Sequence, residues 1–489
     1  MAEILLGHSY FLRHDPKEWR AGKPYPPLGT LHAAAALRAR GRDVAVFDAM
    51  LAAGAEEGRA RILRERPRIF VLYEDSFNYL SKMCLGRMRE AALSMARAAR
   101  DAGARVLASG SDVTDHRRLY ADAGVELVIV GEGETTLVEA ADAILSGGDA
   151  RDVPGTSWLE GDRVQEAPRR TPERDLDVFP SPAWDLVDLD LYRRHWHARH
   201  GFFSLNLVTS RGCPYRCNWC AKPIFSNRYG HHGAERIARD VALLRARYGA
   251  DHVWFADDIF GLAPGWLASF AEHSRGAGVP YKCLSRADLL DDGAVAALRA
   301  SGCAELWIGA ESGSQRILDA MEKDVTVAQI ESAAARLKAA GIKVGFFLQF
   351  GYEGEELPDI HRTLELLARA LPDEIGISVS YPLPGTPFHE RVRARLGAKT
   401  NWDDSADLDT LYETPYGRSF YRALPPVVHR YHRLHRGIAA ARGVARGALS
   451  ARALSRVAAI PVNAALLGMN RSRLHALAAR RVTPARTGA

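Results

Sequence analysis

Short apolar runs alternate with longer stretches of helical periodicity along the first 150 residues. Leu28–Arg40 and Leu85–Asp101 repeat apolar side chains at helical spacing, and a glycine follows each of them. Strands that alternate with helices in this way are typical of a doubly wound parallel sheet, in which ligands bind beyond the carboxyl ends of the strands. The predicted strands are Glu3–Leu6, Asp43–Asp48, Arg68–Tyr73, Arg105–Ser109 and Glu126–Val130.

A second alternating region begins at Phe203, where a strand, a loop and a helix repeat six times. Six such units, rather than eight, predict an open, partial (β/α)6 barrel of the TIM type, with its active site at the carboxyl ends of its strands. Helices are expected, for example, at Ala234–Tyr248 and Gly293–Ala300. The predicted strands are Ser204–Thr209, His252–Ala256, Tyr281–Leu284, Glu305–Gly309, Lys343–Phe350 and Glu374–Ser380.

These patterns divide the chain into four parts. We expect a first domain at 1–150, a linker at 151–200, the barrel at 201–395 and a helical C-terminal region at 396–489. The linker is rich in proline and has a hairpin signal around Glu160–Asp162. The C-terminal region carries an aromatic set that either packs on the barrel or lies over a substrate: Tyr412, Tyr416, Phe420 and Tyr421.

Composition and charge change this picture mainly in the C-terminal region. The 489 residues are 47% hydrophobic and 25% charged, which is ordinary for a globular protein. No apolar run approaches the ~20 residues of a membrane span. The net charge is +6, yet residues 417–489 hold 14 arginines and no Asp, Glu or Lys, so residues 1–416 carry −8 because 6 minus 14 is −8. The basic balance therefore belongs to the C-terminal region alone.

Three of the six cysteines lie within eight residues. Cys213, Cys217 and Cys220 form a C-x3-C-x2-C run directly after an apolar segment. Three thiolates on one loop can hold three corners of a [4Fe–4S] cluster and leave the fourth iron open. The alternative is a zinc site, whose fourth ligand could come from His195, His197 or His200. This spacing is not a secreted disulfide framework, and the N-terminus has no signal-peptide pattern, so we expect a cytoplasmic protein.

The cysteine run, with an aromatic Trp219 before its third cysteine, resembles the radical S-adenosylmethionine (SAM) superfamily. The resemblance implies a [4Fe–4S] cluster whose open iron chelates SAM, a 5'-deoxyadenosyl radical, and an electron donor such as flavodoxin or ferredoxin. It also assigns the loops that follow the barrel strands to SAM, although Ala256-Asp257-Asp258 departs from the family's common Gly-Gly-Glu. The implied SAM-binding residues are Trp219, Asp257, Asp258, Ser285, Arg286, Glu311, Ser312, Gln349, Tyr381 and Pro382.

The first domain, by composition alone, is a Rossmann-like (flavodoxin-like) domain, and a structural or flavin-binding role stays open. Pro26–Gly29 and Val130–Glu134 are similar to the cobalamin (B12)-binding domain fused to many radical SAM enzymes. The D-x-H-x-x-G motif is absent, so the resemblance implies cobalamin without a histidine lower ligand from this motif. The implied cobalamin-binding residues are His8, Ser9, Tyr10, Pro27, Gly29, Thr30, Glu74, Asp75, Ser76, Ser109, Gly110, Ser111, Gly131, Glu132, Gly133 and Thr135.

The resemblance as a whole implies a cobalamin-dependent radical SAM enzyme. Methylation of an unactivated carbon in a small or hydrophobic metabolite is the expected reaction. An anaerobic oxidative cyclase or hydroxylase acting on a tetrapyrrole-like or lipid substrate is an alternative within the class. A cobalamin- or redox-sensing binding protein is an alternative of another class.

The arginine-rich tail suggests three further possibilities. Ile438–Leu454 mixes Ala, Leu, Val and Arg, as an interfacial helix would, which predicts peripheral contact with the inner face of a membrane. Arginine can also bind nucleic acid phosphates, but the tail has no aromatic stacking platform, so nucleic acid is the weaker hypothesis. A solvated helix without a partner is the third.

Overall fold

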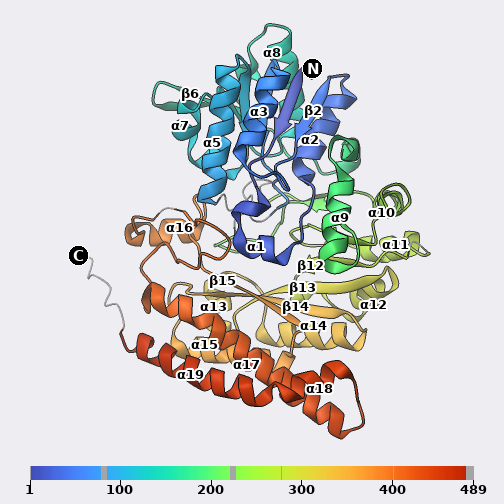
Figure 1. Ribbon diagram of the computed structural model, residues 1–489, viewed down its shortest axis with the longest axis vertical. Helices are drawn as coiled ribbons and strands as arrows, with labels where there is room; N and C mark the ends of the chain where they lie inside the picture. Colours follow the sequence, from blue (N-terminus) through green and yellow to red (C-terminus); the bar gives the residue numbers. More distant parts are fainter. Residues whose placement is uncertain (1, 79–84, 221–226, 277, 400, 481–489) are drawn as a thin grey trace.

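The computed structural model describes residues 2–78, 85–220, 227–276, 278–399 and 401–480. Figure 1 shows three tiers: the first domain, the barrel, and the C-terminal helices at the far end from the first domain. The expected fold class is confirmed: a doubly wound α/β domain, a partial (β/α)6 barrel and a helical C-terminal region. No helix among these residues is long and apolar enough to cross a membrane.

The first sheet has seven strands in the order β2-β1-β3-β4-β5-β6-β7. The five predicted strands are present and pair in parallel, whereas β6 and β7 are antiparallel. These last two strands form the hairpin expected in the linker, and they extend the first sheet as far as Glu166. The strands are β1 Ile4–Gly7, β2 Val44–Phe47, β3 Ile69–Tyr73, β4 Arg105–Ser109, β5 Leu127–Ile129, β6 Thr156–Glu160 and β7 Arg163–Glu166.

Alternate side chains of this sheet enter two different cores, because successive residues of a strand point to opposite faces. Leu6 and Val71 belong to the core that also contains Leu31, whereas Leu5 and Phe70 pack with Met95. Both faces are thus covered, as a doubly wound sheet requires. The helices of this domain are α1 Pro16–Ala21, α2 Leu28–Ala39, α3 Ala55–Glu65, α5 Gly86–Asp101, α6 Ser111–Asp115, α7 Arg117–Asp122 and α8 Glu134–Leu145.

The barrel sheet has six parallel strands in the order β15-β14-β13-β12-β11-β8. Consecutive strands are neighbours, and among the described residues β8 and β15 stand at the two edges without pairing with each other, so the barrel is open rather than a closed ring. The strands are β8 Ser204–Leu207, β11 His252–Phe255, β12 Tyr281–Ser285, β13 Cys303–Glu311, β14 Lys343–Phe350 and β15 Glu374–Val379, with a short pair β9 Ser210–Arg211 and β10 Gly230–His231. The helices are α10 Ala234–Tyr248, α11 Trp266–His273, α12 Asp292–Ala300, α13 Gln315–Ala320, α14 Val327–Ala339, α15 Leu357–Ala370 and α16 Pro387–Val392.

The linker helix α9, Leu189–His200, fastens the first domain to the barrel. The Trp196 indole N–H donates to the Pro24 carbonyl over 2.7 Å, and the Tyr192 hydroxyl donates to Asp48 over 2.7 Å. Tyr25 reaches the barrel itself, where its hydroxyl lies 3.1 Å from the Ser204 hydroxyl. These buried polar contacts hold the two sheets in one arrangement.

The C-terminal region forms α17 Gly417–Ala445, α18 Ala451–Ala458 and α19 Ile460–Ala478. The segment Ile438–Leu454 is therefore divided between α17 and α18. The predicted aromatic set is buried: the Tyr412 hydroxyl donates to the Gly351 carbonyl, and the Leu357 N–H donates to the Tyr416 hydroxyl. These side chains therefore pack on the barrel, which was one of the two roles expected for the aromatic set.

Candidate active site

The cysteine loop begins where β8 ends. Gly212, with φ of 76°, turns the chain into the loop, and Cys213 is buried while Cys217 and Cys220 are half-buried. The five described cysteines carry thiols and none is in a disulfide. Among the described residues, no three His, Cys, Asp or Glu are gathered closely enough to hold a metal ion. The loop continues into 221–226, outside the described residues, so the ligand assignment stays a prediction.

The surroundings of Cys217 fit a thiolate ligand. The Arg286 guanidinium lies 3.9 Å from the Cys217 Sγ and 3.5 Å over the Tyr215 ring. Lys323 is buried nearby; burial opposes its charge, yet its pKa is raised because Glu311 and Cys217 outweigh that effect. Two cationic side chains thus lie beside the Cys217 sulfur, where they would complement the charge of a thiolate ligand.

The three histidines considered for a zinc site lie on α9 and contact other groups. The His195 ring lies tilted at 55° against Trp19 with ring centroids 5.6 Å apart, and the His200 Nε2 is 2.9 Å from the Gly22 carbonyl. His197 is exposed near Asp251. The three histidines therefore lie along the linker helix, against the first domain and the barrel wall. Their positions give no support to a zinc site.

Asn218, between the second and third cysteines, anchors the loop to the barrel. Its side-chain amide donates to the Ala320 carbonyl over 2.9 Å and accepts from the Tyr352 hydroxyl over 2.7 Å. Its backbone pairs with Met321 and Phe388. Sequence analysis missed this residue, although a polar side chain inside a ligand loop was a visible signal. Trp219 packs beside it on the cluster that contains Tyr352 and Phe388.

Asp257 holds the start of the cysteine loop through hydrogen bonds. Its buried carboxylate accepts from the Thr209 N–H at 3.0 Å, the Thr209 hydroxyl at 2.7 Å and the Ser210 hydroxyl at 2.5 Å. Asp258, the next residue, is exposed. Of the two carboxylates predicted to meet the SAM ammonium group, Asp258 is thus the accessible one, whereas Asp257 is occupied by protein donors.

The Asp257→Asn variant is expected to remove a pH dependence of stability. Burial raises the pKa of Asp257 from 3.8 to about 7, against the opposing effect of its hydrogen-bond donors. The folded protein therefore keeps this proton to a higher pH than the unfolded chain does, and the resulting stabilisation is full below about pH 4 and lost as the pH rises to about 7. Urea unfolding measures this effect. As the pH rises from about 5 to about 8, the free energy of unfolding of the wild type should fall by about 2 kcal/mol relative to that of Asp257→Asn. Asp258→Asn is the control, and a pH-independent difference for Asp257→Asn would contradict the assignment.

Arg286 and Ser285 end β12 close to the cysteine loop. Arg286 is buried and donates to Asp288 at 3.0 Å and to the Lys323 carbonyl at 2.9 Å. Its guanidinium is thus shared among Asp288, the loop after α13 and Cys217, and Ser285 is buried beside it. The predicted pairing of Arg286 with the SAM carboxylate stays a prediction, and any such pairing would compete with Asp288.

The end of β13 is strained in a way that is typical of binding sites. Glu311 has φ of 56°, its carboxylate is 3.0 Å from the Lys323 ammonium, and the pairing with β14 shifts register at this point. Ser312 is buried and accepts from the Ser314 N–H. Gln349, on the neighbouring strand, donates to the Ser380 hydroxyl at 2.9 Å, while its buried Oε1 has no hydrogen-bond partner. Tyr381 is buried, and Pro382 lines the cavity described below.

The predicted cobalamin loops lie together at the carboxyl edge of the first sheet. The Ser9 N–H donates to Glu74 over 3.2 Å, and the Gly29 N–H donates to Asp75 over 3.0 Å. The Thr30 hydroxyl donates to the Tyr73 carbonyl over 2.7 Å, one turn after Pro27, which precedes α2. The remaining positions are buried or half-buried at the same edge: Ser76, Ser109, Gly131 and Thr135.

Unpaired buried polar atoms at this edge fit a bound ligand. The His8 Nδ1 and the Glu74 Oε1 are buried without a hydrogen-bond partner, and burial raises the pKa of Glu74. The Tyr10 side chain is buried beside Asp15. A Cβ on Gly110 would lie 3.0 Å from the Glu74 Cβ, and one on Gly133 would lie 2.6 Å from the Tyr73 hydroxyl, so close packing within the protein requires glycine at both positions. Unpaired polar atoms of this kind are costly unless a ligand or water satisfies them.

His8 itself is held by protein groups. Its Nε2 accepts from the Ala49 N–H over 2.9 Å and lies 3.0 Å from the Asp48 carboxylate. The D-x-H-x-x-G motif is absent, so nothing else in the sequence marks this histidine as a ligand.

A buried ion-pair triad joins the loop after β5 to the cysteine loop. Arg211, two residues before Cys213, is 3.1 Å from the Glu132 carboxylate and 2.8 Å from the Glu134 carboxylate. The three side chains are only 2%, 5% and 4% exposed. The Glu132 carboxylate also accepts from the Glu173 N–H at 2.7 Å. Both carboxylates are thus occupied by protein donors, so a cobalamin contact from Glu132 would come from its backbone.

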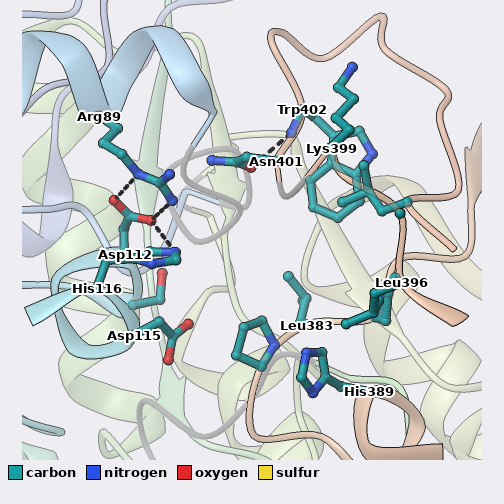
Figure 2. A pocket seen from close by; sticks show the side chains of 15 residues that line it. Arg89, Asp112, Asp115, His116, Leu383, His389, Leu396, Lys399, Asn401 and Trp402 are labelled. Carbon is teal, nitrogen blue, oxygen red and sulfur yellow. Dashed lines mark hydrogen bonds and ion pairs between the residues drawn. The ribbon is translucent and has the colours of Figure 1, made fainter. Parts of the chain in front are cut away.

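A cavity of about 210 Å³ lies between the first domain and the barrel. Figure 2 shows Arg89, Asp112 and His116 on one wall, and Leu383, His389 and Trp402 on the other. Ser111 follows β4 and Pro382 follows β15, and both line it. The carboxyl ends of the two sheets therefore face a shared space, with the cysteine loop joined to the first domain by the Arg211 triad at another point of the same junction.

Comparison with known proteins supports this arrangement. Residues 207–402 match the model of the Radical SAM superfamily. The chain is 28% identical over 290 residues to an uncharacterized methyltransferase of Pyrococcus horikoshii, covering 58% of this chain and 62% of the relative. It is 23% identical to the anaerobic magnesium-protoporphyrin IX monomethyl ester cyclase of Cereibacter sphaeroides, covering 56% of this chain and 45% of the relative. The chain thus spans less than two thirds of either relative. A hopanoid C-3 methylase of Methylococcus capsulatus is 24% identical, covering 85% of this chain and 78% of the relative.

Two solved structures share the fold. The cobalamin-dependent SAM radical enzyme OxsB, with aqua-cobalamin bound, superposes with a TM-score of 0.71 at 15% identity, over 98% of this chain and 84% of its own. The radical SAM methyltransferase TsrM of Kitasatospora setae, with cobalamin and a [4Fe–4S] cluster bound, gives 0.66 at 18% identity, over 80% of this chain and 78% of its own. At these identities the likeness is one of fold.

Proposed function

We infer that this chain, a member of the radical SAM superfamily, is a cobalamin-dependent enzyme that methylates an unactivated carbon of a small or hydrophobic metabolite. The observation that supports this most directly is the junction of the two sheets. The cysteine loop and the predicted cobalamin loops meet across it, bridged by Arg211 and bordered by a cavity. A reaction that passes a group between two cofactors needs their sites to share such a space.

When bound, the cluster and SAM would supply a 5'-deoxyadenosyl radical to remove hydrogen from the substrate, and cobalamin would supply the methyl group. The chain's own residues position these partners. Asp257 holds the start of the cysteine loop, Asn218 anchors it between the second and third cysteines, and the cationic side chains of Arg286 and Lys323 lie beside Cys217. A small-molecule substrate and a flavodoxin or ferredoxin as electron donor complete the proposed set of partners.

The experiment that tests this function uses the full chain, reconstituted with iron, sulfide and cobalamin. Binding comes first: we expect bound cobalamin whose reduced form shows no nitrogen superhyperfine splitting from a protein imidazole. Splitting that disappears in the His8→Ala variant would show that a histidine does ligate the metal. Failure to bind any cobalamin would return the first domain to a structural or flavin-binding role.

The second stage adds SAM, a reductant and candidate substrates. Methylation raises the product mass by one methylene, with 5'-deoxyadenosine formed in step with product. The Cys217→Ala variant should form neither. Absence of SAM cleavage in the reconstituted protein would favour a cobalamin- or redox-sensing binding protein instead.

An anaerobic cyclase or hydroxylase is a second candidate. Three curated relatives of this chain, at 23% to 27% identity, are named as anaerobic magnesium-protoporphyrin IX monomethyl ester cyclases. The same assay separates the two reactions, because cyclisation removes hydrogen and hydroxylation adds oxygen, whereas methylation adds carbon. A tetrapyrrole-like or lipid substrate would accompany this second function.

A further inference from the structure

The solvent side of α18 and α19 carries a stripe of apolar side chains. Leu454, Val462 and Met469 are 50%, 58% and 69% exposed, and Leu449, just before α18, is 71% exposed. Exposed alanines fill the positions between them. The members recur every three or four residues, as on one face of a helix. This outer stripe consists of Ala451, Leu454, Ala458, Val462, Ala465 and Met469.

The outer stripe is not needed for the fold, because the opposite face of α19 already packs on the protein. Leu467, Leu474 and Ala478 belong to the main core, and the Arg430 guanidinium donates to the side-chain Oδ1 of Asn463 over 3.0 Å. Single exposed apolar residues are common on protein surfaces, but an ordered row across two helices indicates an interaction surface.

The C-terminal segment that bears the outer stripe has an excess of positive charge, although Arg418, Arg422 and Arg436 pair with Asp409 or Asp373. Residues 417–489 contain 14 arginines and no acidic residue. Arg452 and Arg473 are exposed on the two helices that bear the outer stripe. Beside Met469, a cavity of about 330 Å³ between α17 and α19 is lined by Ser419, Arg422, Asn470 and Arg473 among others. Arg422 already pairs with Asp409 over 3.2 Å, whereas the Arg473 guanidinium and the Asn470 amide suit a phosphate.

We propose that α18 and α19 lie on the surface of an anionic phospholipid bilayer, with the outer stripe among the acyl chains and the arginines on the phosphates. A helix with an apolar face and flanking arginines binds at such an interface without crossing it. Figure 1 shows α18 and α19 at the end of the molecule opposite the first domain, so a docked enzyme would keep the junction of the two sheets clear of the bilayer. Charge complementarity favours this partner over a second copy of the chain, whose outer stripe would bring like charges together.

The test is co-sedimentation of the full chain with vesicles, without cofactors or substrate, so that its outcome does not depend on the proposed function. Vesicles of phosphatidylglycerol and phosphatidylcholine should bind the protein at least tenfold more strongly than phosphatidylcholine alone, and salt should weaken the binding. The variant Leu454→Ser/Val462→Ser/Met469→Ser should lose about tenfold in partitioning, and Arg452→Gln/Arg473→Gln should lose the preference for anionic vesicles.

A matched control changes apolar side chains of similar exposure elsewhere. Leu63 and Val178 are 54% and 63% exposed, and Leu63→Ser/Val178→Ser should bind as the wild type does. Truncation near Pro425 is a poor test, because Pro425 lies within α17 and the buried Val427 and Val428 would be lost with the helix.

Three outcomes would overturn the proposal. Wild-type protein that stays in the supernatant with anionic vesicles does so directly. Equal binding by the wild type and the triple-serine variant shows that the outer stripe is not the contact. A self-association or duplex DNA binding that the triple-serine variant loses, without vesicle binding by the wild type, assigns the surface to a second copy or to nucleic acid instead.

Discussion

Replacing Cys213, Cys217 and Cys220 together by alanine is expected to remove the cluster iron, the broad thiolate-to-iron absorbance and all reductive cleavage of SAM. In the predicted cluster, one cysteine thiolate holds each of three irons, and an alanine side chain offers no ligand in place of that thiolate. Arg286 and Lys323 beside Cys217 would keep their carboxylate partners Asp288 and Glu311, and neither cation can bind iron in place of a thiolate. Iron analysis and the visible spectrum after anaerobic reconstitution measure the effect.

The control is Cys84→Ala, at a position that lies outside the described residues. This variant should keep its iron, its spectrum and its SAM cleavage. If iron falls as far in Cys84→Ala as in the triple variant, the ligand assignment is wrong. Circular dichroism of the apoproteins should be alike, because the cysteine loop is tied to the barrel through Asn218 whether or not iron is present.

Replacing Arg211 by methionine is expected to lower the free energy of unfolding by about 3–5 kcal/mol. The substitution leaves Glu132 and Glu134 buried beside each other without their cation. Burial already raises the pKa of Glu132 while Arg211 opposes that effect, so its loss makes the charged form costlier still. Urea unfolding at neutral pH measures the change, and cobalamin and iron content should fall together because the triad joins both loops.

Two matched variants test the cause. Arg211→Met/Glu132→Gln/Glu134→Gln removes the uncompensated charges and should recover much of the lost stability. Arg38→Met breaks the pair with Asp185, which has a similar 2.8 Å separation but is 43% and 51% exposed, and should cost less than about 1 kcal/mol. An Arg211→Met loss as small as that of Arg38→Met would mean that the triad does not hold the domains together.

Periodicity predicted the elements closely where one face of each is buried. The ranges Arg105–Ser109, Lys343–Phe350 and Ala234–Tyr248 agree at both ends with β4, β14 and α10. Agreement is poorest at β13, predicted as Glu305–Gly309 but extending from Cys303 to Glu311. There the strand continues through a register shift and a positive φ at Glu311, a conformation that local propensity does not favour and that tertiary packing imposes.

The hairpin of β6 and β7 also shows what the local sequence does not predict. Its turn at Glu160–Asp162 was visible in the sequence, but its partner was not. β6 pairs with β5 of the first sheet and β7 pairs with β6, since an edge strand with unpaired backbone groups is open to pairing. Which edge a short hairpin joins depends on contacts between distant segments.

The sequence by itself determined the two α/β sheets and the C-x3-C-x2-C loop, because strand alternation, helix periodicity and ligand spacing are local properties. It also determined the arginine-rich tail. Only the tertiary structure decided how these parts serve a site. Arg211 meets Glu132 and Glu134 from 77 to 79 residues away, and Asn218 is held by Tyr352 from the far side of the barrel. Such pairs form because the carboxyl ends of two separate sheets are packed against each other, and nothing in the local pattern of either segment records its partner.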